Sequence, residues 1–128
     1  MELNFFARRR ILKKTNALDL VPIRRCGHQA EDDGKITVLI PKFKNEKISR
    51  FMLGKRSPYI HIHFDDIGSK VWLEIDGIKD IRTITENLKS HFGETFVQAE
   101  KRINKFMSRL YEERYITFRQ LEDARKKQ

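Results

Sequence analysis

Apolar and polar residues alternate strictly in one short stretch of the chain, YIHIHF at residues 59–64. In an extended segment, one face would carry Ile60, Ile62 and Phe64. The opposite face would carry Tyr59, His61 and His63. This pattern is typical of a half-buried β-strand. Two further β-type runs, at 23–30 and 35–43, flank an Asp-Gly pair, which is a strong hairpin signal between such runs. We therefore expect three strands in the first half of the chain.

Apolar residues spaced by three or four predict three helices after the third strand. The first helix begins at Asp65 or Asp66 as N-cap, and Gly77 supplies the left-handed residue just past its end. The second opens at Thr83, with Glu86 three residues later in the spacing of a capping box. The third helix has the broadest apolar stripe, made by Phe96, Ala99, Ile103, Phe106, Met107 and Leu110.

The remaining segments are shorter. RYITF indicates a final strand, followed by a charged helical tail opened by Thr117 with Gln120. Residues 48–53 fit a helical turn between the second and third strands, and the first ~15 residues form either a short amphipathic helix or a frayed arm. We expect Trp72, in the first helix after the strands, to anchor that helix in the core.

Strands followed by helices indicate the α+β class. We expect a winged-helix-like arrangement, in which an N-terminal three-stranded antiparallel sheet is followed by a three-helix bundle. A chain of 128 residues fits one domain. We place this domain at 21–118, between an N-terminal extension at 1–20 and the charged tail at 119–128.

The net charge of +9 matters mainly through its distribution. Residues 1–25 carry seven Lys/Arg against two acids and 101–128 carry nine against four, whereas 66–100 carry four against seven. A nucleic-acid binder usually concentrates cations on its docking element, so a basic, solvated surface explains the charge equally well. One cysteine excludes an intrachain disulfide, and no apolar run approaches the ~20 residues of a membrane span. We expect a cytoplasmic location.

Two pairs of residues raise the question of a metal site. His61 and His63 lie two apart on one strand, and Cys26 and His28 lie two apart on another. The four converge on zinc only if the strands are neighbours in the right register, and we favour the interpretation that they are ordinary sheet-face residues. The sequence has no Gly-rich phosphate loop, HExxH or GxSxG motif. We expect no enzyme activity, no cofactor and no metal.

The run from residue 59 to residue 93, followed by a helix and LYEERYITF, resembles the pyrroloquinoline quinone biosynthesis protein D (PqqD) family. Asp76 and Gly77 stand at the Asp-Gly that ends the first helix of that family. Residues 83–86 stand at the opening of the second helix, and residues 106–116 match the closing segment. Together with VPIRR before the first strand, the resemblance covers about residues 21–118.

The resemblance implies a non-catalytic adaptor that binds the leader of a ribosomally made precursor peptide. Such adaptors present the precursor to a modifying enzyme, often a radical S-adenosylmethionine protein. In the family the leader adds as a strand to the edge of the third strand, and it packs into a groove against the third helix. The matching edge residues are Tyr59, Ile60, His61, Ile62 and His63. The matching groove residues are Ile103, Phe106, Met107 and Leu110, which the apolar stripe alone also allows to be core.

Two departures from the family leave other partners open. The N-terminal extension and the long connection at 44–58 can each cover the strand edge, and the chain would then bind itself, a second copy in a homodimer, or a different partner. Nucleic-acid binding by a winged helix-turn-helix is the rival function. Its recognition helix would offer Lys101, Arg102, Lys105 and Arg109. Because Glu94 and Glu100 lie near the end of that helix that normally approaches bases, we favour the peptide adaptor.

Overall fold

The computed structural model describes residues 3–43 and 45–127. It divides into two compact units. The sheet unit runs from Cys26 to Ser69, and the helical unit takes the chain up to Arg25 and again from Lys70 onward. The two stretches of the helical unit are therefore joined by the sheet unit, which is inserted between them.

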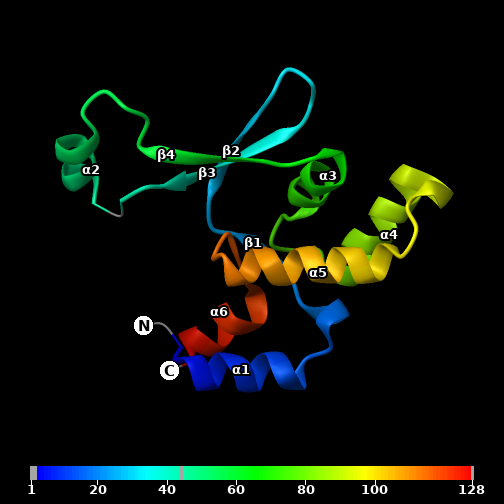
Figure 1. Cartoon of the computed structure of the whole chain (residues 1–128). Helices are drawn as coiled ribbons and strands as arrows, with labels where there is room; N and C mark the ends of the chain where they lie inside the picture. Colours follow the sequence, from blue (N-terminus) through cyan, green and yellow to red (C-terminus); the bar gives the residue numbers. More distant parts are fainter. Residues whose placement is uncertain (1–2, 44, 128) are drawn as a thin grey trace. The chain divides into compact units, whose positions relative to one another are not determined.

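The sheet unit is a three-stranded antiparallel sheet with the order β2-β3-β4 (Figure 1). Its elements are β2 (Gly27–Ala30), β3 (Ile36–Pro41), α2 (Glu46–Leu53) and β4 (Tyr59–His63). The turn between β2 and β3 holds Gly34 at φ +84°, where its N–H donates to the Glu31 carbonyl at 2.9 Å. The predicted hairpin, the three-stranded sheet and a helix within the connection are thus confirmed.

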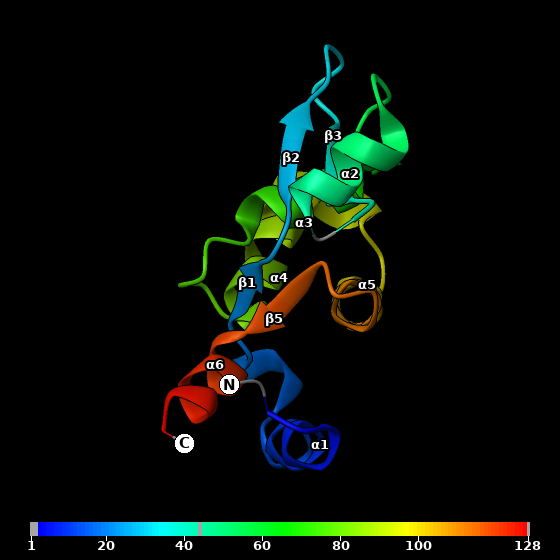
Figure 2. The same cartoon turned by 90° about the vertical axis from the view of Figure 1, so that its left-hand side faces the viewer.

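The helical unit contains most of the helices and a second, two-stranded sheet (Figure 2). Its elements are α1 (Phe5–Lys14), η1 (Ala17–Asp19), β1 (Pro22–Arg24), α4 (Ile81–Phe92), η2 (Gly93–Thr95), α5 (Ala99–Glu112), β5 (Ile116–Phe118) and α6 (Arg119–Lys126). α3 (Asp66–Glu74) begins in the sheet unit and ends in the helical unit. β1 and β5 pair antiparallel, with Ile23 opposite Thr117. The α+β class is confirmed, while the winged-helix-like detail stays a prediction.

The core of the helical unit is apolar and closely packed, with α4 lying against α5. Its most buried side chains are Val71, Trp72, Ile75, Ile81, Ile84, Leu88, Ile103, Met107, Leu110 and Ile116. Trp72 is completely buried, which confirms its role as a core anchor. The guanidinium of Arg24 lies 5.7 Å from the centre of the Trp72 ring and donates from Nε to the Trp72 carbonyl at 3.1 Å. β1 therefore holds the end of α3 by one side chain.

The first predicted strand is wrong in one respect, because residues 23–30 form two strands in different sheets. β1 pairs with β5, and the Arg25 N–H continues that pairing by donating to the Tyr115 carbonyl at 2.9 Å. After Cys26 the chain enters the other unit, where β2 pairs with β3. The single run of β-type residues therefore serves two separate ladders.

Two predicted helix starts are also displaced. α4 begins one turn before Thr83, because the Asp80 carboxylate caps it by accepting the Thr83 N–H at 2.8 Å. α6 has Phe118 as N-cap, without a side-chain bond to the helix. Gln120 instead accepts the Val21 N–H at 3.1 Å.

Other predictions for local structure are confirmed. Asp65 caps α3, since its carboxylate accepts the Gly68 N–H at 2.7 Å. Gly77 has φ +78° shortly after that helix. Of the two alternatives for the N-terminal residues, the structure has the helix: α1 is capped by Asn4 and lies beside α6.

Candidate peptide-binding site

The register of the sheet determines which backbone groups β4 offers at its outer edge. The Lys42 N–H donates to the Pro58 carbonyl at 2.8 Å, and the Phe64 N–H donates to the Ile36 carbonyl at 2.9 Å. In an antiparallel ladder, residues alternate between bonding the partner strand and pointing away from it. The even-numbered residues of β4 therefore bond β3. The residues whose N–H and C=O groups point to the other edge are Tyr59, His61 and His63.

That outer edge is partly closed at its beginning by one side chain. The Ser57 hydroxyl accepts the Tyr59 N–H at 3.2 Å and donates to the Tyr59 carbonyl at 3.4 Å. His61 and His63 remain, and within the described part of the sheet unit no strand pairs with β4 other than β3. The edge accordingly offers two N–H donors and two carbonyl acceptors to an extended backbone.

The two faces of the sheet beside this edge differ in polarity. Ile62 stands opposite Val38, and Ile60 stands opposite Ile40, so one face is apolar. The other face carries the exposed His61 and His63 side chains. A peptide strand added at the edge would present alternate side chains to an apolar and to a polar neighbourhood.

The polar face contains a hydrogen-bonded group of side chains. His63 Nδ1 lies 2.8 Å from the Thr37 hydroxyl oxygen. Gln29 Nε2 donates to the Glu31 carboxylate at 3.0 Å. Hydrogen bonds from Thr37 and Gln29 lower the pKa of Glu31, and the charges of His63 and His61 lower it further. A carboxylate therefore lies close to the two histidines.

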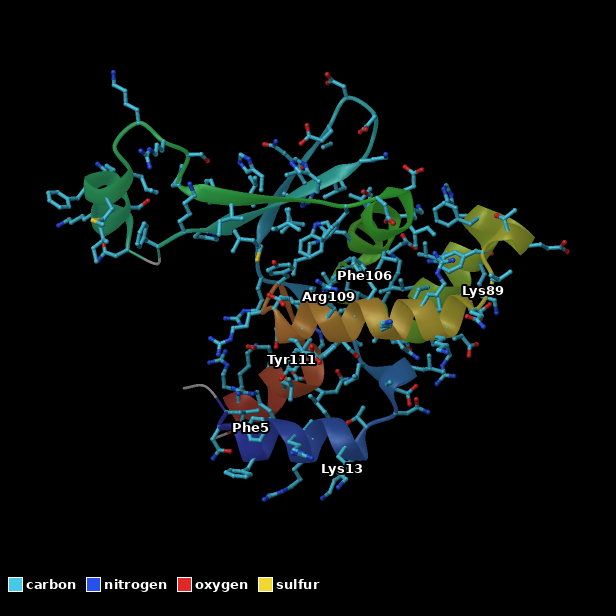
Figure 3. The ribbon with its side chains drawn as sticks, viewed as in Figure 1. Phe5, Lys13, Lys89, Phe106, Arg109 and Tyr111 are labelled. Atoms are coloured by element: carbon cyan, nitrogen blue, oxygen red, sulfur yellow. The ribbon has the colours of Figure 1, made fainter. Side chains whose placement is uncertain are left out.

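The four groove candidates lie on one helix, α5, but they differ in accessibility. Ile103, Met107 and Leu110 are buried in the core of the helical unit. Phe106 is half-buried, and it projects from a different side of α5 than Tyr111, whose ring lies 5.2 Å from that of Phe118 (Figure 3). Of these four residues, Phe106 is the one with surface that a ligand can touch. The structure thus places the five edge residues on one strand and the four groove candidates on one helix of the other unit.

The register also decides the question of a zinc site. His28 pairs opposite Val38, and Val38 pairs opposite Ile62, so these three side chains share a face. His61 and His63 are on the opposite face, because successive residues of a strand alternate. The histidines therefore do not converge, and the described residues contain no group of three or more His, Cys, Asp or Glu side chains that could hold a metal.

The four cations named for the rival nucleic-acid function are exposed on α5. Its outer face exposes Lys101, Arg102, Lys105 and Arg109. The Arg102 guanidinium lies 4.9 Å from the centre of the Phe96 ring, which occupies one face of that cation. Glu100 is exposed in the first turn of the same helix, so an acid lies beside these cations. Within the described residues, no helix has the length and apolar character required to cross a bilayer.

Sequence reasoning missed two features of the sheet unit. The Ser57 hydroxyl binds the Tyr59 N–H at the start of the β4 edge. The Ser-Pro pair directly before the alternating run indicated a turn at this place. α2 exposes an apolar face at Ile48, Phe51 and Met52, whose i, i+3, i+4 spacing was readable in the sequence.

Comparison with known proteins gives one family. Residues 59–116 match the sequence model of the family described as Coenzyme PQQ synthesis protein D (PqqD). A search of curated proteins and of solved structures found no match. The matched segment runs from the start of β4 to the start of β5 and includes all nine candidate peptide-binding residues. The resemblance seen in the sequence is therefore confirmed over residues 59–116, which are similar to the PqqD family, and members of that family are non-catalytic, peptide-binding adaptors.

Proposed function

We propose that this chain is a non-catalytic adaptor that binds the leader of a ribosomally made precursor peptide and presents it to a modifying enzyme of the radical S-adenosylmethionine type. The observation that carries the proposal is the outer edge of β4, where His61 and His63 direct their backbone groups away from β3. A leader in extended conformation would add there as a fourth strand. The main-chain hydrogen bonds would supply affinity, and alternate side chains would supply selectivity.

The side chains along the edge indicate what the leader should contain. Side chains on one side of the added strand would lie beside Ile60 and Ile62, and those on the other side would lie beside His61 and His63. Apolar residues at every second position therefore suit the apolar face. A contact between an apolar leader residue and Phe106 of α5 is a second part of the proposal, to be tested separately.

A proline substitution tests the edge directly. His61→Pro removes an N–H that points out of the sheet, and proline is tolerated at such edge positions because the ladder to β3 does not use that donor. The matched control His61→Ala removes the side chain and keeps the N–H. Peptides of 20 residues selected from a displayed random library on the whole chain serve as probes, with affinity measured by fluorescence titration.

His61→Pro is expected to weaken the selected peptides roughly tenfold or more, since it removes one backbone hydrogen bond and obstructs its neighbours. His61→Ala is expected to stay within about threefold, and both variants should unfold thermally near the temperature of the unaltered chain. Equal affinity for a folded His61→Pro variant and the unaltered chain would refute strand addition at β4.

The same protein also tests the nucleic-acid alternative. A helix-turn-helix function predicts duplex DNA affinity that falls steeply with added salt and is lost in a Lys105→Glu, Arg109→Glu double variant. Absence of duplex binding at moderate salt would remove that alternative. Duplex binding without peptide binding would replace the adaptor proposal.

A further inference from the structure

α2 turns its apolar side chains toward solvent. Ile48, Phe51 and Met52 share one face of the helix, and they are 51%, 87% and 60% exposed. Among the side chains of α2 that the structure describes, the one that is buried is Ser49. A helix in a globular protein normally buries its apolar face and exposes its polar one, so α2 presents a surface that a ligand can cover.

The helix is firmly built in spite of its exposure. The Asn45 side chain caps its start by accepting the N–H groups of Lys47 at 2.8 Å and Ile48 at 3.4 Å. At its other end Gly54 has φ +58° and donates its N–H to the Arg50 carbonyl at 3.0 Å. Capping at both ends stabilises the helix and so keeps the three apolar residues on one face.

The connection that contains α2 is rich in exposed positive charge. The exposed cations of the connection include Lys42, Lys47, Lys55 and Arg56. Residues 42–58 contain one acidic residue, Glu46. The complementary ligand is therefore a segment that carries carboxylates next to apolar side chains.

α2 lies directly before β4 and in the same unit. Tyr59 follows Gly54 by five residues, which span roughly 17 Å at full extension. Tyr59 and Ile60, the first two residues of the edge strand, are themselves exposed, at 41% and 48%. Figure 1 shows α2 at the end of the sheet where β3 ends and β4 begins.

We propose that the face formed by Ile48, Phe51 and Met52 binds a continuation of the peptide held at β4, and that this continuation is an acidic segment with apolar side chains. The inference rests on the proposed function, because it extends the same peptide beyond the strand edge. An anionic membrane or a second copy of the chain would also cover these side chains. The peptide alone accounts for the position of α2 next to the edge strand.

Peptides of 20 residues selected from the displayed random library on the whole chain are the probe. They are titrated against Phe51→Ser and against a Lys47→Glu, Lys55→Glu double variant. The matched controls are Ile78→Ser and Lys13→Glu, which alter another strongly exposed apolar residue and another exposed cation in the helical unit. All four changes are at exposed positions, so thermal unfolding should be unchanged.

The selected peptides are expected to combine an alternating apolar stretch with Asp or Glu near further apolar residues. Phe51→Ser should lower affinity roughly tenfold or more, because a largely exposed ring would become buried on binding. The double charge reversal should lower affinity severalfold, more at low salt than at high salt. Both controls should stay within about twofold.

The outcomes separate this inference from the function on which it rests. If His61→Pro loses affinity and Phe51→Ser does not, strand addition at β4 is supported and the role of α2 in peptide binding is overturned. No loss in either variant overturns both. Binding to vesicles of phosphatidylcholine and phosphatidylglycerol that Phe51→Ser abolishes would assign α2 to a membrane. A dimer that Phe51→Ser converts to monomer in sedimentation would assign α2 to a second copy. Either result overturns the inference.

Discussion

Phe106 and Met107 are adjacent on α5 but have different surroundings. Met107 is 1% exposed in the core of the helical unit, whereas Phe106 is half-buried. A charged side chain at Met107 would lose its hydration without gaining a partner. A polar side chain at Phe106 would keep part of its surface in water. Substitutions at Met107 therefore test the stability of the helical unit, and substitutions at Phe106 test peptide binding.

Met107→Asp is expected to unfold the helical unit or to destabilise it by about 3 kcal/mol or more, because it buries a carboxylate and removes core contacts. Phe106→Ser is expected to lower stability less and to weaken the selected peptides if the leader contacts α5. Circular dichroism during thermal unfolding, together with peptide titration, checks both. A well-folded Met107→Asp variant that has lost only peptide binding would place Met107 in the binding groove.

The Asp76 carboxylate, in the turn after α3, makes the stability of the fold depend on pH. It accepts the N–H groups of Lys79 and Ile78, both at 2.9 Å, and lies 3.0 Å from Lys79 Nζ. These hydrogen bonds, that of the Lys79 N–H first, lower the pKa of Asp76 far below its usual value near 3.8. A depressed pKa in the folded state means that the carboxylate stabilises the fold above its unfolded pKa, and that this contribution is lost as pH falls toward the folded value.

Stability should therefore decline between about pH 4.5 and pH 2, and Asp76→Asn should show a smaller decline over that range. Asparagine keeps an oxygen that accepts the two N–H groups, so the comparison isolates the titration from the turn geometry. Urea unfolding at a series of pH values gives the two slopes. Parallel slopes would mean that Asp76 has no part in the acid sensitivity.

At the scale of the element, the sequence pattern predicts helix α4 correctly but not the residue at which it begins. Thr83 and Glu86 have the spacing of a capping box, yet Asp80 caps the helix one turn earlier. Glu86 instead lies 3.8 Å from Lys89, as an exposed pair on the helix surface. Both candidates fit the sequence, and the choice depends on how the chain arrives, with the Ile81 N–H donating to the Leu20 carbonyl at 2.9 Å.

Asp80→Ala is expected to cost about 1 kcal/mol of unfolding free energy, the usual value for a lost N-cap. Glu86→Ala should cost a few tenths of a kcal/mol at most, since it removes only an exposed ion pair. Chemical denaturation of the two variants compares them. A reversed order would restore Thr83 and Glu86 as the functional cap.

A local sequence pattern identifies an element but not its neighbours in the fold, and this explains which parts of the site could be predicted. Alternation in YIHIHF was enough to predict β4 and its two faces, because a strand has a period of two. The register with β3 was not readable from one strand, and it decides that His28 lies opposite Val38, away from His61. Likewise the stripe of α5 predicted an apolar face, but its width did not tell which side chains a neighbour covers.

At the scale of the whole molecule, the matched family segment and the compact units do not coincide. Residues 59–116 begin in the sheet unit and end in the helical unit. The ladder partner of β4 is β3, and the partner of β5 is β1, and both partners lie outside that segment. The sequence predicted three strands, three helices and a final strand in RYITF, but it did not predict that the first residues of the run at 23–30 pair with that final strand.

A fragment comprising residues 59–116 is expected not to fold, because it keeps β4 without its partner β3, cuts β5 after its first residue, and loses the burial that both ladders provide. Its circular dichroism should show little ordered structure and no cooperative unfolding, whereas residues 3–127 should unfold cooperatively. A cooperatively folded fragment would show that the matched segment is independent of β1 and β3.

The pairing of β1 with β5 has a consequence for the newly made chain. Synthesis on the ribosome proceeds from the N-terminus, so β2, β3 and β4 all emerge well before β5. The helical unit can close its small ladder only after the chain has left the exit tunnel as far as Phe118. The strand border that we assign to the leader peptide is thus built from early, local pairings, and the nascent protein carries it while the residues around it are still being translated.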